Sequence, residues 1–388
     1  MNINRYRTVA LVLMVGLLVA AFAAIGCGGS TTESPTPAPS ASASTAAGGA
    51  DQAHAQAQLD PLSALPTFEP AGPAFDAKAV MAGKSIMSIP GTGTDPFYVQ
   101  MNKGMKFAAD AVGYPFSVWN NQGQLTQYQQ GFANAITKKV SLIDLLAGPD
   151  PNALKPQIDE AKAAGILVVS SHLSGIEQEV PNVDYNLPID YNLAGRLLAD
   201  WVITKDTTAH VLVIVSDEIV STGAMRDGIT SEFDTYGGPD IEYTFVNVPI
   251  PEWGTKIKPS VQSAIVADPA LTYIVCIYDS MAQFVTPAID ATNSADQIKV
   301  IGFNGTPFVL DLVRTGKVEM DLGESLNWAG MAIADAEMRL IGDMGLVESM
   351  NIPFRLFTAD NAAEAGVPAE FSKGYGDFRS EYSTLWGL

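Results

Sequence analysis

The chain is poor in cysteine, histidine and basic side chains. It has two cysteines and three histidines in 388 residues, and its 22 lysines and arginines stand against 42 aspartates and glutamates. The resulting net charge of −20 argues against a nucleic-acid partner, because nucleic-acid phosphates are bound by lysine and arginine. No G-x-S-x-G, H-E-x-x-H or Cys/His cluster occurs, so the sequence indicates no activated nucleophile, no metal site and no cofactor.

The chain begins with a short basic segment and a long apolar run. Arg5 and Arg7 precede TVALVLMVGLLVAAFAAIG, which ends in small residues leading into Cys27. This pattern resembles a bacterial lipoprotein signal peptide over residues 1–27, with Cys27 as the lipidated residue. A plain transmembrane anchor is the alternative, because the run approaches spanning length. Either way, we expect the folded part outside the cytoplasmic membrane, with Cys276 as a buried hydrophobe that forms no intramolecular disulfide.

A stretch with almost no large apolar side chains follows. Residues 28–58 are rich in Ala, Ser, Thr, Pro, Gly and Gln and cannot bury enough surface to offset the entropy of ordering. Residues 59–83 are transitional and partly Pro-rich. The sequence therefore predicts a disordered tether and lead-in over 28–83.

From Lys84 onward, apolar runs alternate with amphipathic stretches, which is typical of parallel sheets covered on both faces. In the first half, strands are expected at 85–90, 116–120, 141–147 and 166–172, and helices at 96–113, 124–139 and 151–165. In the second half, strands are expected at 210–216, 241–248, 272–279, 298–304 and 318–322, and helices near 222–236, 254–267, 281–291, 306–315 and 327–342. Two such halves predict two α/β lobes with a ligand cleft at the carboxyl ends of the strands.

The stretch SIPGTGTDPFYVQMNKG, residues 88–104, contains a G-x-G after the first expected strand. A dinucleotide-binding loop needs a third glycine where this sequence has Pro96, and Asp95 would repel a pyrophosphate. Asp95 and Pro96 instead suit the N-cap and first residue of a helix. The loop is thus expected to present a carboxylate together with the rings of Phe97 and Tyr98.

Four segments in order resemble periplasmic-binding-protein type I sugar receptors, of the ribose-binding kind. They are DPFYVQMNKGMKFAADAVGY (95–114), YNLAGRLLADWVITK (191–205), VIGFNGTP (300–307) and RTGKVEMDLGESLNWAG (314–330). The resemblance covers roughly residues 84–360. It implies an α/β fold of two doubly wound parallel-sheet lobes joined by a multi-crossing hinge. The N-terminal lobe would comprise 84–187 plus 324–350, and the C-terminal lobe 188–323 plus 351–388.

The resemblance also implies a function. Such a protein is a non-enzymatic, monomeric receptor that captures a sugar or polyol and delivers it to an ABC permease in the membrane. The ligand-binding residues it implies in this sequence are Asp95, Phe97, Tyr98, His172, Trp253, Tyr278, Asn304 and Glu324. Each has a simpler structural role as an alternative; Asp95 could act only as an N-cap, and Glu324 could bridge hinge strands.

The sequence departs from the family pattern where charged side chains would clamp sugar hydroxyls. His172 and Leu173 replace an Asp-Arg pair, Met225 stands where an arginine is expected although Arg226 is adjacent, and Tyr278 replaces an asparagine. These changes admit a less polar or aromatic solute as an alternative ligand. A hydrolase or isomerase using His172 is the alternative from another class. A sugar-responsive repressor is excluded, because the expected signal peptide stands where a helix-turn-helix would be needed.

Overall fold

The structure is a computed structural model that describes residues 49–93 and 95–388. The predicted signal peptide, Cys27 and residues 28–48 of the predicted tether lie outside the described residues. In the part that is described, no helix combines the length and apolar character needed to cross a membrane.

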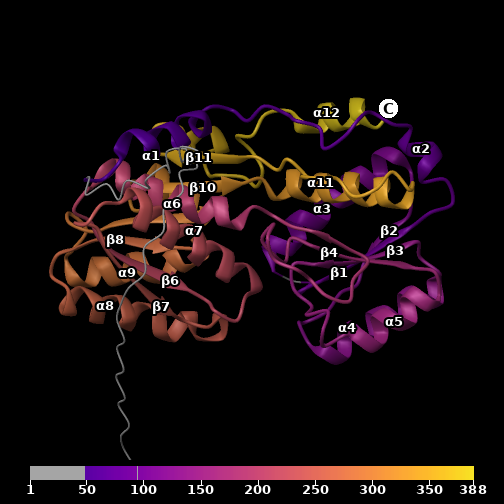
Figure 1. Cartoon of the computed structure of the whole chain (residues 1–388), viewed down its shortest axis with the longest axis horizontal. Helices are drawn as coiled ribbons and strands as arrows, with labels where there is room; N and C mark the ends of the chain where they lie inside the picture. The colour runs from indigo at the N-terminus through magenta and orange to yellow at the C-terminus, as the bar shows by residue number, and fades with distance from the viewer. Residues whose placement is uncertain (1–48, 94) are drawn as a thin grey trace, which may run out of the picture. The chain divides into compact units, whose positions relative to one another are not determined.

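Two separate β-sheets organise the chain (Figure 1). The first has the order β2-β1-β3-β4-β5 and consists of β1 (Ile86–Pro90), β2 (Phe116–Val118), β3 (Leu142–Leu146), β4 (Leu167–Ser171) and β5 (Tyr185–Leu187). The second has the order β11-β10-β9-β8-β6-β7 and consists of β6 (His210–Val215), β7 (Glu242–Asn247), β8 (Leu271–Cys276), β9 (Lys299–Asn304), β10 (Met320–Glu324) and β11 (Phe354–Thr358). All pairings are parallel except that of β10 with β11. Both sheets therefore contain the doubly wound strand order 2-1-3-4-5, which confirms the predicted α/β class.

The α-helices surround these sheets. They are α1 (Gln52–Leu59), α2 (Ala77–Val80), α3 (Pro96–Val112), α4 (Leu125–Lys138), α5 (Lys155–Ala163), α6 (Tyr191–Lys205), α7 (Val220–Tyr236), α8 (Lys258–Ala267), α9 (Ala282–Thr292), α10 (Pro307–Arg314), α11 (Leu326–Ile341) and α12 (Phe378–Leu385). The expected helices and strands from Lys84 to residue 342 are all present, with ends shifted by a few residues. The helix α3 begins as predicted, because the Asp95 carboxylate accepts a hydrogen bond from the backbone N–H of Phe97 at 2.8 Å.

Two helix pairs pack so closely that their backbones touch. In α3 and α11, which lie side by side in Figure 1, a Cβ on Gly330 would lie 2.1 Å from the carbonyl oxygen of Met101. In α6 and α7, a Cβ on Gly195 would lie 2.3 Å from the Met225 carbonyl oxygen, and one on Gly228 would lie 2.2 Å from that of Asn192. No other residue type fits these positions without moving the helices apart.

Replacing Gly330 by alanine is expected to lower the free energy of unfolding by about 1–3 kcal/mol, the usual cost of overpacking a core. This loss would outweigh the gain in helix propensity of about 1 kcal/mol that alanine brings. Chemical denaturation measures the difference. The matched control is Gly223→Ala in α7, where the new Cβ would come no nearer than 3.5 Å to Gln178 Nε2. Equal losses in both variants would contradict the close-packing explanation.

The structure differs from the predicted tether and lead-in over residues 49–83. Residues 52–59 form α1, which buries Ala55 and Leu59 against α6 and α7. The helix forms because alanine and glutamine have high helix propensity, and tertiary contacts supply the burial that the composition did not reveal. Further along, the ring of Phe68 packs against Trp328 of α11 at 6.0 Å between centroids.

The end of the chain also differs from the predicted lobe boundaries. The predicted C-terminal lobe includes residues 351–388, and β11 does join the second sheet. The helix α12, however, packs on α11: Phe378 stacks on Trp328 at 4.8 Å, and the indole N–H of Trp386 donates to Asp335 Oδ1 at 2.8 Å. The two ends of the described chain therefore behave alike. The N-terminal segment runs from α1, which packs on α6 and α7, to α2, which packs on α11, and the C-terminal segment runs from β11 in the second sheet to α12 on α11.

Candidate functional site

A cavity of about 190 Å³ lies at the carboxyl ends of strands from both sheets. It is lined by Asp95, Phe97, Tyr98, Ala147, His172, Leu173, Tyr191, Ile219, Ser221, Ile250, Trp253, Tyr278, Ser280, Asn304 and Thr306. Carboxyl ends at the point where strand order reverses are where open α/β sheets bind ligands.

Strained backbone is concentrated at this cavity. Three of its lining residues other than glycine have positive φ angles: Ala147 at 48°, His172 at 54° and Asn304 at 147°. Each stands at or just after the end of a strand, namely β3, β4 and β9. Such conformations cost of order 1–3 kcal/mol each and persist where the surrounding structure holds them, typically at functional sites.

Aromatic rings line both sides of the cavity. In α3, which follows β1 of the first sheet, Phe97 and Tyr98 meet edge to face at 5.3 Å, and the Tyr98 hydroxyl donates to the Ala147 carbonyl at 2.9 Å. From the second sheet, the rings of Trp253 and Tyr278 are nearly parallel, with centroids 6.5 Å apart. Burial, and after it the nearby Asp95 carboxylate, raise the pKa of Tyr98 above its usual value.

His172 is fixed by two side chains from other elements. Its Nε2 lies 2.8 Å from Glu324 Oε1, at the end of β10, and its Nδ1 lies 2.7 Å from the hydroxyl of Tyr191, at the start of α6. The side chains of His172 and Glu324 are both fully buried. With both ring nitrogens engaged, His172 has no nitrogen free to act as a general base on a substrate.

One residue that lines the cavity carries a polar atom without a protein partner. Asn304 is 7% exposed, and its buried Oδ1 lacks a hydrogen-bond partner. A buried amide oxygen without a partner costs about 1–3 kcal/mol, so a donor on a ligand would remove a penalty. The Tyr278 hydroxyl, by contrast, has a partner, because it lies 3.0 Å from Ser221 Oγ. Burial raises the pKa of Tyr278, and its hydrogen bonds with Ser221 and Thr222 oppose that rise.

A buried carboxylate holds the loop after β9 in place. Asp279 Oδ2 accepts hydrogen bonds from the backbone N–H of Thr306 at 2.7 Å and from its hydroxyl at 2.6 Å. Burial raises the pKa of Asp279 to about 6, and the bonds from Thr306 lower it. These bonds fix Thr306, and with it the loop that follows Asn304.

Among the described residues, no lysine or arginine lines the cavity. Met225, which stands where the family pattern has an arginine, is fully buried in the core. The adjacent Arg226 pairs with Asp217 at 2.8 Å. Asp95 is the one acidic side chain that lines the cavity in the described part of the chain.

All of the predicted ligand-binding residues line this cavity except Glu324, which contacts His172 instead. The alternative role of Glu324, a bridge between strands, matches its position. The other lining residues were not among the predicted ligand-binding residues: Ala147, Leu173, Tyr191, Ile219, Ser221, Ile250, Ser280 and Thr306. Position in the sequence could have indicated Ser221 and Ser280, since each follows a predicted strand of the second half.

Two doubly wound sheets that share a cavity at their carboxyl ends define a solute-binding protein of the bilobal type. The chain belongs to the periplasmic binding protein domain family, whose model matches residues 86–342. Proteins of this family carry solutes rather than catalyse reactions.

Individual relatives are distant. The chain is 24% identical to the ribose import binding protein of Salmonella typhimurium over 262 residues, which are 67% of this chain and 86% of that protein. A solved myo-inositol binding protein from Caulobacter matches with a TM-score of 0.60 and 21% identity, over 74% of this chain and 97% of the other. A 5-methylthioribose transporter solute binding protein from Thermotoga lettingae matches with a TM-score of 0.63 and 17% identity, over 78% and 92% of the two chains.

Proposed function

We propose that the chain is an extracytoplasmic receptor that captures a small molecule, a monosaccharide or related polyol, and delivers it to an ABC-type importer. The observation that carries this proposal is the cavity, which aromatic rings and Asn304 line at the carboxyl ends of both sheets, with the buried Oδ1 of Asn304 left without a partner. Family membership and the resemblance to ribose and myo-inositol binding proteins support the same ligand class.

In this proposal the ligand is held between aromatic faces from the two sheets. Phe97 or Tyr98 would cover one face of the ring and Trp253 the other, because aromatic faces suit the apolar faces of a sugar. Asp95 and Asn304 would supply hydrogen bonds. The buried His172 would present its ring edge, with its orientation fixed by Glu324 and Tyr191.

A less polar or aromatic solute is the second candidate ligand. It is favoured by the apolar lining residues Leu173, Ile219 and Ile250 and by the lack of lysine and arginine on the described cavity wall. The 5-methylthioribose-bound relative supports a sugar carrying an apolar substituent. An enzyme that uses His172 has no comparable support, because both of its ring nitrogens are engaged.

A thermal-shift screen tests the function. Monosaccharides, polyols, methylthio-sugars, nucleosides and phenolic acids are each added to the protein, and one class is expected to raise the Tm, because a ligand that binds only the folded state stabilises it. Chromatography then recovers the ligand that gives the largest shift. Recovery of a chemically altered molecule would contradict a receptor, and a best ligand from the phenolic acids would favour the second candidate.

We further propose that Cys27 carries a lipid and anchors the monomeric receptor to the membrane. The support is the sequence alone: Arg5, Arg7 and the apolar run that ends in small residues before Cys27. Mass spectrometry of the exported protein is expected to find a lipidated N-terminal Cys27. A mature protein that retains Met1 would contradict the lipid on Cys27 and favour the transmembrane alternative.

A further inference from the structure

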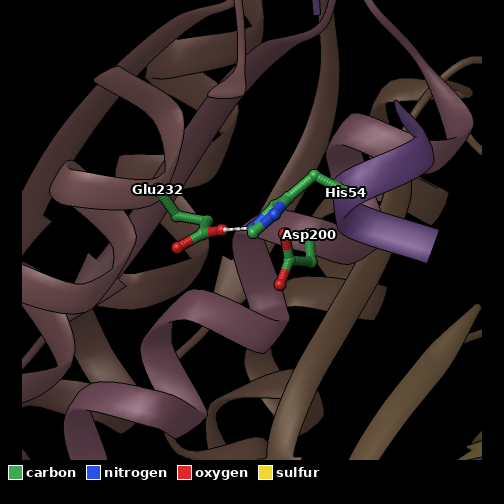
Figure 2. Close-up of side chains that lie close together, drawn as sticks. All are labelled: His54, Asp200 and Glu232. Atoms are coloured by element: carbon green, nitrogen blue, oxygen red, sulfur yellow. Dashed lines mark hydrogen bonds and ion pairs between the residues drawn. The ribbon is translucent and has the colours of Figure 1, made fainter. Parts of the chain in front are cut away.

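Three titratable side chains that are far apart in the sequence lie close together in the structure. His54 of α1, Asp200 of α6 and Glu232 of α7 point toward one another (Figure 2). Each offers one ligand atom, and these atoms lie within 4.8 Å of one another. His54 Nε2 is 2.8 Å from Glu232 Oε1.

Both carboxylates are buried, and that of Asp200 has no partner. Asp200 is 1% exposed, and neither of its carboxylate oxygens has a hydrogen-bond partner. Glu232 is 3% exposed, and its Oε1 lies 2.8 Å from His54 Nε2. Buried carboxylates are expensive unless they are paired or bind a metal ion.

Nearby positive charge is insufficient to balance these two groups. The positive charge of Arg196 attracts the Asp200 carboxylate, but among the described residues Arg196 forms an ion pair with neither Asp200 nor Glu232. A divalent cation at this point would supply the positive charge that these two buried carboxylates lack.

The packing of α6 and α7 explains why the carboxylates are so close. The helices touch at Gly195 and Gly228, and Asp200 and Glu232 stand about one helical turn further along each helix. The His54 ring is placed against this pair by its stacking on Tyr236, with ring centroids 3.6 Å apart and planes 9° from parallel. The backbone N–H of Asp51 also donates to the Tyr236 carbonyl at 2.8 Å, so the start of α1 is aligned before any metal binds.

We propose that His54, Asp200 and Glu232 bind a divalent transition-metal ion, for which Zn²⁺ is the best match, and that this ion fixes α1 to the α6–α7 pair. One imidazole and two carboxylates suit Zn²⁺, which takes four ligands at about 2.0–2.2 Å from nitrogen and oxygen. Ca²⁺ and Mg²⁺ prefer sites made of oxygen alone. The His54 side chain is 25% exposed, which leaves room for water as the fourth ligand.

Calorimetric titration of the purified full chain with ZnCl₂, after removal of metal by a chelator, tests the proposal. We expect one Zn²⁺ per chain. Loss of a direct ligand should exceed the 10–100-fold cost typical of outer-shell changes, so His54→Gln and Asp200→Asn should each weaken Zn²⁺ binding at least about 100-fold. The matched control is His210→Gln, because His210 is also partly exposed and bonded to a carboxylate, Asp268, at 2.8 Å, yet lies outside this cluster.

Thermal unfolding supplies a second measurement, the change in Tm that Zn²⁺ causes. If His54 only packed against its neighbours, its replacement would not abolish this change. Zn²⁺ is expected to raise the Tm of the parent and of His210→Gln by several degrees, and to leave the Tm of His54→Gln unchanged. CaCl₂ at the same concentration should leave all three unchanged. Absence of Zn²⁺ binding to the parent, equal binding by His54→Gln, or an equal effect of Ca²⁺ would each overturn the proposal. Because the cluster lies outside the ligand cavity, these outcomes are independent of the solute-binding proposal.

Discussion

Replacing Trp253 by alanine is expected to weaken binding of the screened ligand by about 2–4 kcal/mol, the range of aromatic hot spots. The indole N–H is already bonded within the protein, to Ser216 Oγ and to the Val248 carbonyl, both at 3.0 Å. These bonds hold the ring in place beside Tyr278 and leave its face to contribute to binding. Calorimetric titration measures the change.

Two controls separate stacking from folding. Trp253→Phe keeps an aromatic face but loses the indole N–H, so it should bind more strongly than the alanine variant and more weakly than the parent. The Tm of each variant without ligand reports any loss of stability. If the alanine variant remains folded and binds like the parent, the proposed ligand site is misplaced.

Replacing Glu324 by alanine is expected to lower the free energy of unfolding by about 1–3 kcal/mol, the usual cost of leaving a buried donor without an acceptor. The substitution would leave His172 Nε2 buried without an acceptor, since both side chains are inaccessible to solvent. Chemical denaturation measures this loss. Glu324→Gln keeps an oxygen within reach of His172 and should cost less.

An exposed glutamate provides the comparison. Glu370 pairs with Lys373 at 3.0 Å, but its side chain is 67% exposed. Glu370→Ala is therefore expected to change stability by no more than about 0.5 kcal/mol. Similar losses in Glu324→Ala and Glu370→Ala would mean that the contact between Glu324 and His172 contributes little to stability.

The sequence predicted most of the elements from Lys84 to residue 342 because apolar runs and amphipathic stretches alternate regularly there. The Asp95 cap was also predictable, since Asp-Pro at a helix start has a local physical cause. The strand β5 was missed because no helix separates it from β4, so the alternating pattern does not reach it, and β11 was missed because it lies beyond the last expected helix. The alanine- and glutamine-rich α1 was missed because it buries few large side chains.

The candidate site was predictable in part, for a related reason. Residues that follow predicted strands, such as Phe97 and Asn304, could be placed at the sheet ends without coordinates. The contact of Tyr191 with His172 could not be predicted, because it depends on how the chain turns between β4 and α6. The grouping of His54 with Asp200 and Glu232 could not be predicted for the same reason. These partners lie far from His54 in the sequence, on two helices whose close approach is a tertiary feature.

The segment between the first helices has a mechanical consequence. The Ser63 carbonyl accepts a hydrogen bond from Asn361, just beyond β11 of the second sheet, while Phe68 packs on Trp328 of α11. Only residues 64–67 separate these two attachment points, and an extended chain spans at most about 3.3–3.6 Å per residue. This short connection joins the loop after β11 to α11 on the outside of the protein, in addition to Ser325, which links β10, the partner strand of β11, to α11. Moving these two attachment points further apart than residues 64–67 can span would require Phe68 to leave Trp328 or the contact between Ser63 and Asn361 at 3.5 Å to break.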